Sequence, residues 1–203
     1  MVNGGSNGSA NGNDALENFM RALVGHNSLR AEVVTSMEQL VQVFALRSLG
    51  YMEETVMPFD HAYDGNDLQA THFIAYDHAE PVGTMRVRWF KDFAKLERTF
   101  FRKTHRGIPN IKVLVDFVFA HITRKGYSMV ITHSSPLYAR LWRMHFGFHK
   151  VAKEPARYHN EDYYELVRYL DVPPDAIGPE TDAKVLYRVE GKWDEPAKYE
   201  ELK

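Results

Sequence analysis

The sequence predicts a mixed α/β fold in which one central, mostly antiparallel twisted sheet is flanked by helices. Three short segments with strand-type patterns follow one another at residues 71–76, 82–89 and 95–101, and turn residues separate them. Such a run is typical of consecutive antiparallel strands. An amphipathic helical pattern comes next and leads into a short apolar strand at residues 127–132, which indicates a strand–helix–strand crossover.

The segments before this sheet also have regular patterns. Apolar residues recur at helical spacing over residues 14–25, and residues 29–35 have the composition of a strand. Ser36 and Gln39 have the spacing of a capping box, which predicts the start of a second helix. Gly50 is the expected end of that helix, because glycine is common just after a helix.

The remaining elements follow from turn and cap residues. Residues 58–66 are rich in Asp, Gly and Asn and are expected to form a loop. The crossover helix should end at Gly126, and a further helix should begin after Ser135 and be followed by a final strand. Residues 163–170 are expected to form one more edge strand or a short helix.

Length and composition favour a single domain with two tails. The 203 residues are 44% hydrophobic, which is enough for one sizeable core. We expect a disordered leader at residues 1–13, because Asn, Gly and Ser dominate it, and a folded domain over residues 14–170. Residues 171–203 alternate proline, charge and aromatic residues, which predicts a tail that wraps around the surface.

Charge and composition narrow the possible functions. The chain has no cysteine, so a disulfide framework and a thiolate nucleophile are excluded. A net charge of −2 argues against a generic nucleic-acid binder. There is no apolar run of about 18 residues and no signal peptide, so we expect a cytoplasmic protein without a membrane span. The ten histidines lack the spacing that places two on one helix face, so no metal site is expected.

A basic turn connects the third strand of the sheet to the crossover helix. Backbone N–H groups and the helix dipole favour anions at a helix N-terminus, and the basic side chains here add positive charge. We therefore expect this turn to hold the phosphate groups of a cofactor or donor substrate. Its candidate residues are Arg102, Lys103, His105, Arg106 and Gly107.

Several motifs, taken in order, resemble a known superfamily. They are Ala45-Leu46-Arg47, Asp64-Gly65-Asn66-Asp67, residues 70–77, Pro81-Val82-Gly83-Thr84-Met85-Arg86 and Leu96-Glu97. The strands and the basic turn resemble the core of the Gcn5-related N-acyltransferase (GNAT) fold. Within it, the motifs look like the acyl-homoserine-lactone autoinducer synthases and still more like the long-chain N-acyl amino acid synthases from soil DNA, the N-acyltyrosine producers. The similarity covers residues 30–150.

The resemblance implies an acyltransferase that joins a fatty acyl group to the α-amine of an amino acid, with tyrosine as the acceptor. It implies that Glu97 is the general base and that Arg86 binds the carboxylate of the acceptor. Asp64 and Asp67 would bind the ammonium group or order the loop, and Arg47 would pair with them. Alternatively, Glu97 has only a structural role and forms an ion pair with Arg86, Arg98 or Arg102.

Departures from the family pattern bear on the donor. Alignment of the phosphate-binding motif places Pro109 and Ile111 where two small residues are usual, and proline lacks an amide donor. This favours the acyl-phosphopantetheine of an acyl carrier protein over acyl-coenzyme A, with no cofactor bound tightly. Arg143 replaces the usual tyrosine acid, so Tyr138 or His145 would protonate the thiolate if a side chain does so. Basic residues outside the turn could dock an acidic carrier: Arg124, Lys125, Arg140 and Arg143.

Two other classes of function stay open. The first is an acetyl-coenzyme A-dependent N-acetyltransferase that acts on a small molecule or a protein. The second is a non-catalytic acyltransferase-like domain that senses a ligand or acts as a scaffold, since two expected motifs are altered at Pro109 and Arg143. The presence of Asp64, Arg86 and Glu97 together favours an enzyme.

Overall fold

The structure is a computed structural model that describes residues 29–158 and 161–200. The predicted leader and the helix predicted over residues 14–25 lie outside the described residues. An eight-stranded sheet forms the centre, with strand order β1-β2-β3-β4-β5-β8-β6 and β7 paired to β8. The strands are β1 (Leu29–Val33), β2 (Thr71–Asp77), β3 (Glu80–Trp89), β4 (Ala94–Phe101), β5 (Met129–Ser134), β6 (His149–Lys150), β7 (Ala156–Tyr158) and β8 (Glu161–Tyr169).

The predicted run of antiparallel strands is confirmed. β1, β2, β3 and β4 pair in order as antiparallel neighbours, and β5 then pairs with β4 in the parallel direction after the crossover. Residues 163–169 of this predicted segment belong to the strand β8 rather than to a helix. The prediction of an edge position was wrong, because β8 pairs with β5 on one side and with β6 on the other.

Helices cover both faces of the sheet. They are α2 (Met37–Arg47), η1 (Ser48–Glu54), α3 (Phe59–Ala62), η2 (Gly65–Gln69), η3 (Lys103–His105), α4 (Ile108–Arg124), α5 (Pro136–His145), α6 (Ala183–Leu186) and η4 (Lys198–Glu200). The predicted stop at Gly50 was wrong, because a π-helical segment continues through Glu54. The predicted loop at residues 58–66 contains α3 and the start of η2.

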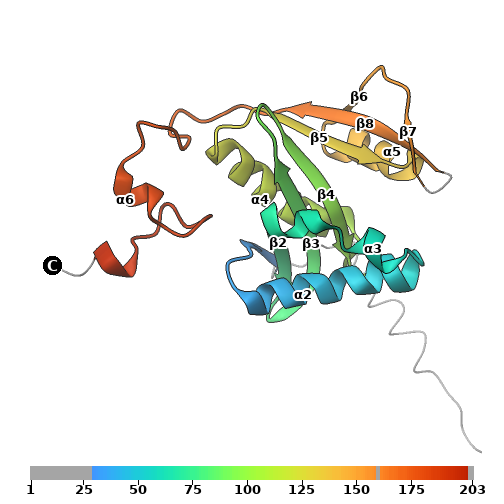
Figure 1. Ribbon diagram of the computed structural model, residues 1–203, viewed down its shortest axis with the longest axis horizontal. Helices are drawn as coiled ribbons and strands as arrows, with labels where there is room; N and C mark the ends of the chain where they lie inside the picture. The colour runs from blue at the N-terminus through green and yellow to red at the C-terminus, as the bar shows by residue number, and fades with distance from the viewer. Residues whose placement is uncertain (1–28, 159–160, 201–203) are drawn as a thin grey trace, which may run out of the picture.

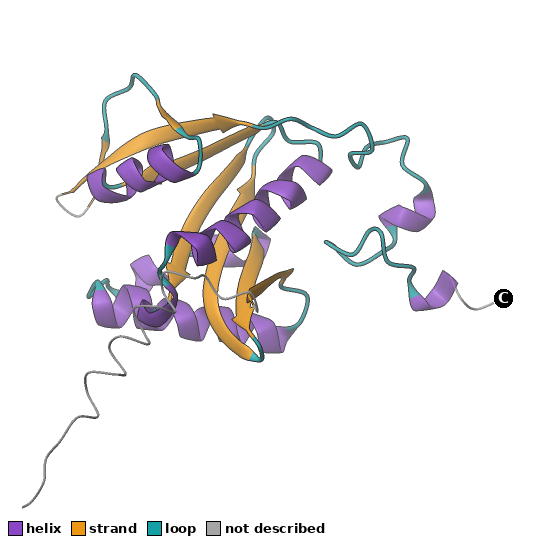
Figure 2. Ribbon diagram, turned by 180° about the vertical axis from the view of Figure 1, so that it is seen from behind, coloured by secondary structure: helices purple, strands orange, loops and turns teal. Residues whose placement is uncertain are grey.

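The two faces carry different layers because side chains alternate along each strand. Phe73, Met85 and Leu96 point to the face where α4 packs, and together with Leu114 and Val118 of α4 they belong to the main core. Ile74, Tyr76 and Phe100 point to the other face and pack against Val43 and Leu46 of α2. Figure 1 shows α2 in front of the sheet, and Figure 2 shows α4 along its opposite side.

The strands β4 and β5 part soon after they meet. Their pairing runs only from Ala94↔Val130 to Leu96↔Thr132, although both strands continue beyond it. Figure 1 shows the two strands diverging in a V, with α3 below the opening. A parting between two central strands leaves their facing backbone groups without strand partners, which makes this a place where a ligand can bind.

A bulge in β4 lies at the start of this divergence. The register between β3 and β4 shifts between Thr84 and Arg86, and Arg98 has φ 54°. A non-glycine residue with a positive φ is uncommon and costs free energy, so the fold holds it in place through other contacts. The bulge reverses the alternation of β4, so that Lys95 and Glu97 share the face of Phe100.

The C-terminal segment after β8 contacts the C-terminal end of α4. The Trp193 ring stacks on His121 with centroids 5.0 Å apart, and Glu190 accepts a hydrogen bond from Lys125 at 2.8 Å. Arg124 pairs with Asp175 and Asp194. Figure 1 shows α6 and the segment around it beyond the end of α4. In the described part of the chain, no helix is both long enough and apolar enough to span a bilayer.

Candidate active site at the parting of β4 and β5

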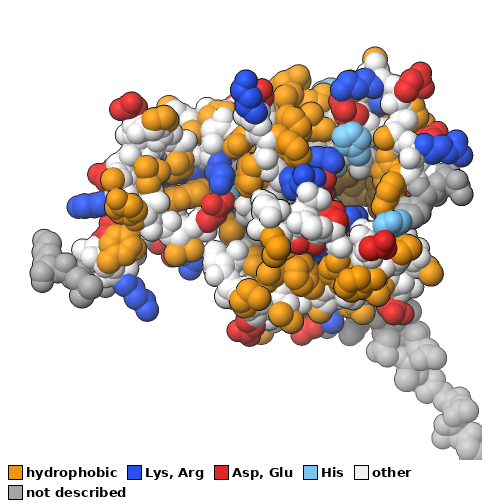
Figure 3. Space-filling model, in the orientation of Figure 1, with side chains coloured by type: hydrophobic (Ala, Val, Ile, Leu, Met, Phe, Trp, Pro, Cys, Tyr) orange, Lys and Arg blue, Asp and Glu red, His pale blue; other side chains and the backbone are white. Residues whose placement is uncertain are grey.

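A row of polar side chains crosses the sheet on the face of α2. Cross-strand register places His72 of β2 opposite Arg86 of β3, and Arg86 opposite Glu97 of β4. On the other side of the parting, His133 of β5 lies opposite Glu165 of β8. Figure 3 shows a hollow on this face, bordered by Lys or Arg, Asp or Glu, and His side chains.

Arg86 is the centre of a buried ion-pair network. Its side chain is 2% exposed, and all five of its N–H groups have carboxylate acceptors. Nη1 donates to Asp64 at 2.6 Å and to Asp67 at 2.7 Å, and Nη2 donates to Asp64 at 3.0 Å and to Glu97 at 2.6 Å. Nε donates to Glu97 at 3.1 Å. This arrangement leaves no donor of Arg86 for the carboxylate of an acceptor.

Two further arginines fix the loop above the sheet. Arg47 is fully buried and donates to Asp67 at 2.6 Å and to the carbonyl oxygen of Ala62. Arg98, placed by the bulge, donates to Asp64 at 3.1 Å and to the carbonyl oxygen of His61 at 2.7 Å. Arg47 therefore pairs with Asp67, one of the two residues of the predicted acidic pair, whereas Asp64 pairs with other arginines. These bonds tie α2, α3 and η2 to β3 and β4.

The surroundings of Glu97 lower the pKa of its carboxyl group, whereas a general base near neutral pH needs a raised pKa. Burial alone would raise the pKa of its carboxyl group, but hydrogen bonds and charges from Lys95 and Arg86 outweigh burial and lower that pKa. Lys95 donates to Oε1 at 2.8 Å, and Arg86 holds Oε2. The ion pair with Lys95 is the contact that the resemblance did not include. Glu97 is ionised at neutral pH and is available to attract an ammonium group.

Acid should weaken the fold through this network. The hydrogen bond from Arg86 holds the pKa of Asp64 well below its usual range, and the pKa of Asp67 is also lowered, because hydrogen bonds from Arg47 and Arg86 outweigh the effect of burial. A lowered folded-state pKa stabilises the fold fully above the unfolded-state value of about 4 and is lost as the pH falls through the folded-state value. The contribution of Asp64 is the difference in the free energy of unfolding in urea between the unaltered protein and Asp64→Asn, which cancels the titration of the histidines. This difference should be level from pH 7 to 5 and shrink below pH 4, and a difference that already shrinks at pH 6 would contradict the assignment.

His133 lies at the mouth of the parting, and the sequence reasoning did not select it. Its Nε2 is 3.5 Å from Oε2 of Glu165, and its Nδ1 is buried without a hydrogen-bond partner among the described residues. Burial lowers the pKa of His133, and the charge of Lys95 lowers it further, so the imidazole is neutral at pH 7. In the sequence, only its position directly after the predicted strand at residues 127–132 could have suggested a role for His133.

The predicted phosphate turn lies at the N-terminus of α4, but ion pairs occupy most of its side chains. Arg102 pairs with Glu80, Arg106 with Glu54 at 2.8 Å, and His105 with Asp77 at 3.2 Å. Lys103 forms no ion pair within residues 29–158 and 161–200. Pro109 occupies the first turn of α4, and the amides of Gly107 and Ile108 have no acceptor within the same ranges. Backbone amides therefore remain for an anion here.

The other predicted basic residues divide into two groups. Arg124 and Lys125 are engaged by the carboxylates of the C-terminal segment, so they are not free to dock a partner. Arg140 and Arg143 lie on α5, form no ion pair with any described residue, and line a surface hollow together with Met144 and His149. The available basic surface is thus on α5.

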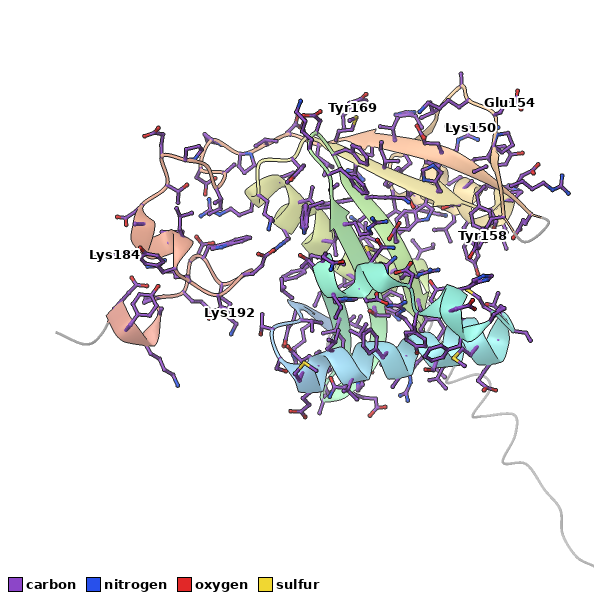
Figure 4. The ribbon with its side chains drawn as sticks, viewed as in Figure 1. Lys150, Glu154, Tyr158, Tyr169, Lys184 and Lys192 are labelled. Carbon is purple, nitrogen blue, oxygen red and sulfur yellow. The ribbon has the colours of Figure 1, made fainter. Side chains whose placement is uncertain are left out.

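Tyrosines lie on both sides of the parting. Tyr51 of η1 donates to the carbonyl oxygen of Thr99 at 3.3 Å, and burial raises the pKa of Tyr51 to about 12. Tyr138 of α5 is 59% exposed and is close enough to influence the pKa of Tyr51 and of Tyr163. The Tyr158 ring, labelled in Figure 4 between β7 and α3, lies 5.8 Å from the His61 ring and connects the two sides of the opening. Among the described residues no cluster of His, Asp and Glu has metal-site geometry.

Comparison with known proteins identifies the class of fold. No protein-family model matches the sequence. The structure of a candidate N-acetyltransferase from Lactobacillus plantarum superposes with a TM-score of 0.65 at 20% identity, covering 71% of this chain and 99% of that one. The described chain has the Gcn5-related N-acyltransferase fold, a mixed α/β architecture with a mostly antiparallel open sheet flanked by helices. The expected fold class is confirmed.

Other similar proteins include a candidate acetyltransferase, an N-acyl amino acid synthase and an acyl-homoserine lactone synthase. A candidate acetyltransferase of Bacillus subtilis is 28% identical over 129 residues, which is 62% of this chain and 87% of that protein. FeeM, an N-acyl amino acid synthase from uncultured soil microbes, superposes with a TM-score of 0.56 at 12% identity over 72% of this chain and 92% of its own. The coenzyme A-dependent acyl-homoserine lactone synthase BjaI gives 0.57 at 17% identity, covering 73% and 85%.

Proposed function

We propose that the protein is an N-acyltransferase that moves a long-chain fatty acyl group from the phosphopantetheine thioester of an acyl carrier protein to the α-amine of an amino acid. The observation that carries this proposal is the parting of β4 and β5 beside the Arg86 network. The unpaired strand edges offer backbone groups to an extended thioester arm. The chain shares its fold with acyltransferases, and one of these is an N-acyl amino acid synthase. This similarity supports acyl transfer to an amine.

The reaction needs a neutral amine and a place for the leaving thiolate. The amine nitrogen attacks the thioester carbonyl carbon, the C–S bond breaks, and the proton lost by nitrogen ends on sulfur or in water. An α-amine has a pKa of about 7.7 to 8.0, so a fraction is neutral at pH 7 without a strong base. Glu97 would attract and orient the ammonium form, which loses one proton to water before it attacks. The exposed Tyr138 hydroxyl would donate a proton to the thiolate and regain one from water, which takes up the second proton released by nitrogen.

Two features of the chain favour a carrier protein as the donor. Pro109 removes one amide from the first turn of α4, which suits one phosphodiester better than a pyrophosphate. Arg140 and Arg143 are exposed and unpaired among the described residues, as docking to an acidic carrier surface requires. Acetyl-coenzyme A remains the second candidate donor, because the Bacillus subtilis relative is described as an acetyltransferase.

Charge reversal on α5 tests the donor. Arg140→Glu with Arg143→Glu should lower the kcat/KM for acyl carrier protein by about 10-fold or more at low salt, because steering by surface charge is lost. The kcat/KM for the same acyl group on coenzyme A should change little. Initial rates with both donors at two salt concentrations measure this.

The matched control carries the same change of charge elsewhere. Lys184→Glu with Lys192→Glu alters the C-terminal segment, and Figure 4 shows these two lysines on the opposite side of the molecule from Lys150 and Glu154. This double variant should leave carrier-dependent turnover intact. If the unaltered protein uses acyl-coenzyme A as well as or better than the acyl carrier protein, and the α5 charge reversal has no effect, then the donor is acyl-coenzyme A and the carrier proposal is wrong.

A further inference from the structure

Two positive side chains lie directly opposite each other on the sheet, next to the Arg86 network. The register pairs Arg88 of β3 with Lys95 of β4, and both point to the face of Arg86 and Glu97. Like charges directly opposite each other on a sheet face are destabilising. The two side chains are also only 29% and 25% exposed, so water screens their repulsion incompletely.

The hydrogen-bonding capacity of this pair is mostly unused. Nζ of Lys95 is 2.8 Å from Oε1 of Glu97, and Nη1 of Arg88 is 3.8 Å from the same oxygen. At that distance the Arg88 side chain makes no hydrogen bond to Glu97, and it makes none to any other described residue. Its guanidinium carbon lies 5.1 Å from the centroid of the Phe90 ring, a contact that uses none of its N–H donors. Arg86, two residues earlier on the same strand, has every donor occupied.

The local charge balance also leaves room for an anion. Five cations belong to the connected set, Arg47, Arg86, Arg88, Lys95 and Arg98, against three anions, Asp64, Asp67 and Glu97. The neighbouring His72 and His133 have lowered pKa values and add no charge at pH 7. The excess is centred on Arg88, because it is the one cation of this set whose side chain has no hydrogen-bonded carboxylate partner among the described residues, and the neighbouring Lys95 shares its partner Glu97 with Arg86.

We propose that Arg88 and Lys95 bind the carboxylate of the acceptor amino acid, a role that the sequence assigned to Arg86. A carboxylate there would bridge two cations that lie within 3.8 Å of one common oxygen, and the planar guanidinium of Arg88 can hold it with two parallel hydrogen bonds. The α-ammonium would then point along the sheet toward Glu97, where β4 separates from β5. This assignment rests on the proposed function, since it names what the acceptor must carry.

The experiment compares each free L-amino acid with its C-terminal amide, which keeps the amine and removes the carboxylate. Tyrosine, phenylalanine and leucine serve as the probes, with the better acyl donor from the preceding assay. We expect the unaltered protein to prefer the free acid by about 10- to 100-fold in kcat/KM, as charge-assisted hydrogen bonds imply. Arg88→Gln should abolish that preference by raising the KM for the acid, with kcat for the acid nearly unchanged.

The matched control is Lys91→Gln, which removes one positive charge from the exposed turn between the same two strands. It should keep the full preference for the acid. Equal use of acid and amide by the unaltered protein would overturn the carboxylate site while leaving acyl transfer in place.

Binding without turnover separates the two proposals. If none of the amines is acylated with either donor, the proposed function fails. The melting temperature with free acid and with amide then decides on the site alone. The carboxylate site is supported if the free acid raises the melting temperature more than the amide does, and if Arg88→Gln removes this rise while Lys91→Gln keeps it. Equal melting temperatures with acid and amide would overturn the site.

Discussion

Replacement of Arg86 by Met is expected to lower the free energy of unfolding by about 3 to 5 kcal/mol, because it leaves three carboxylates without their shared cation in a largely buried site. Methionine keeps much of the volume of the side chain, so the loss reports on charge and hydrogen bonding rather than on a cavity. Urea unfolding at pH 7 measures the change. The loss should shrink toward pH 3, because below pH 4 the unaltered protein loses the stability that its ionised carboxylates contribute, and the variant does not have this contribution to lose.

Arg88→Met is the matched control on the same strand and the same face. Arg88 forms no hydrogen bond to a described residue, so we expect a change within about 1 kcal/mol. If the two variants lose equal stability, the ion-pair network around Arg86 does not stabilise the fold.

Glu97→Gln is expected to lower kcat/KM for the acceptor by about 100-fold, because the substrate ammonium loses its nearest available charge and Arg86 loses one of its partners. The pH dependence of the reaction rate tests the role of Glu97 more directly. Since the pKa of Glu97 is lowered, it stays ionised throughout the working range, and the only rise in rate should follow the acceptor amine near pH 7.7 to 8.0.

A second inflection between pH 5 and 7 that disappears in Glu97→Gln would instead make Glu97 a general base with a raised pKa. A lowered melting temperature with unchanged turnover per folded molecule would make it a structural ion pair only. Measurement of the pH–rate profile and the melting temperature on one preparation separates these outcomes.

The fold was largely predictable because local patterns and pairing agree. Apolar alternation located β2, β3 and β4, and the capping box at Ser36 located the start of α2, where Ser36 caps Gln39. Two features were not predictable from local pattern. The π-helical segment passes Gly50 because the Phe100 ring packs against that glycine, where a side chain would collide. The place of β8 between β5 and β6 depends on pairings distant in sequence.

The candidate site was predictable as a set of residues but not as an arrangement. The resemblance selected Asp64, Asp67, Arg86 and Glu97, and they lie together. It could not show that Arg86 is saturated, because that depends on how many carboxylates reach one guanidinium. Arg98 was missed as a member, since only the positive φ of the bulge directs it to Asp64.

The brief pairing of β4 with β5 also governs how the molecule comes apart. The antiparallel meander of β1 to β4 and the arm of β5 and β8 are joined in the sheet by three residue pairs, with α4 as the covalent link between them. Neighbouring antiparallel strands form from contacts close in sequence, whereas this parallel joint must wait for the whole crossover. We therefore expect the β4–β5 pairing to form late in folding and to separate first when force is applied across the sheet.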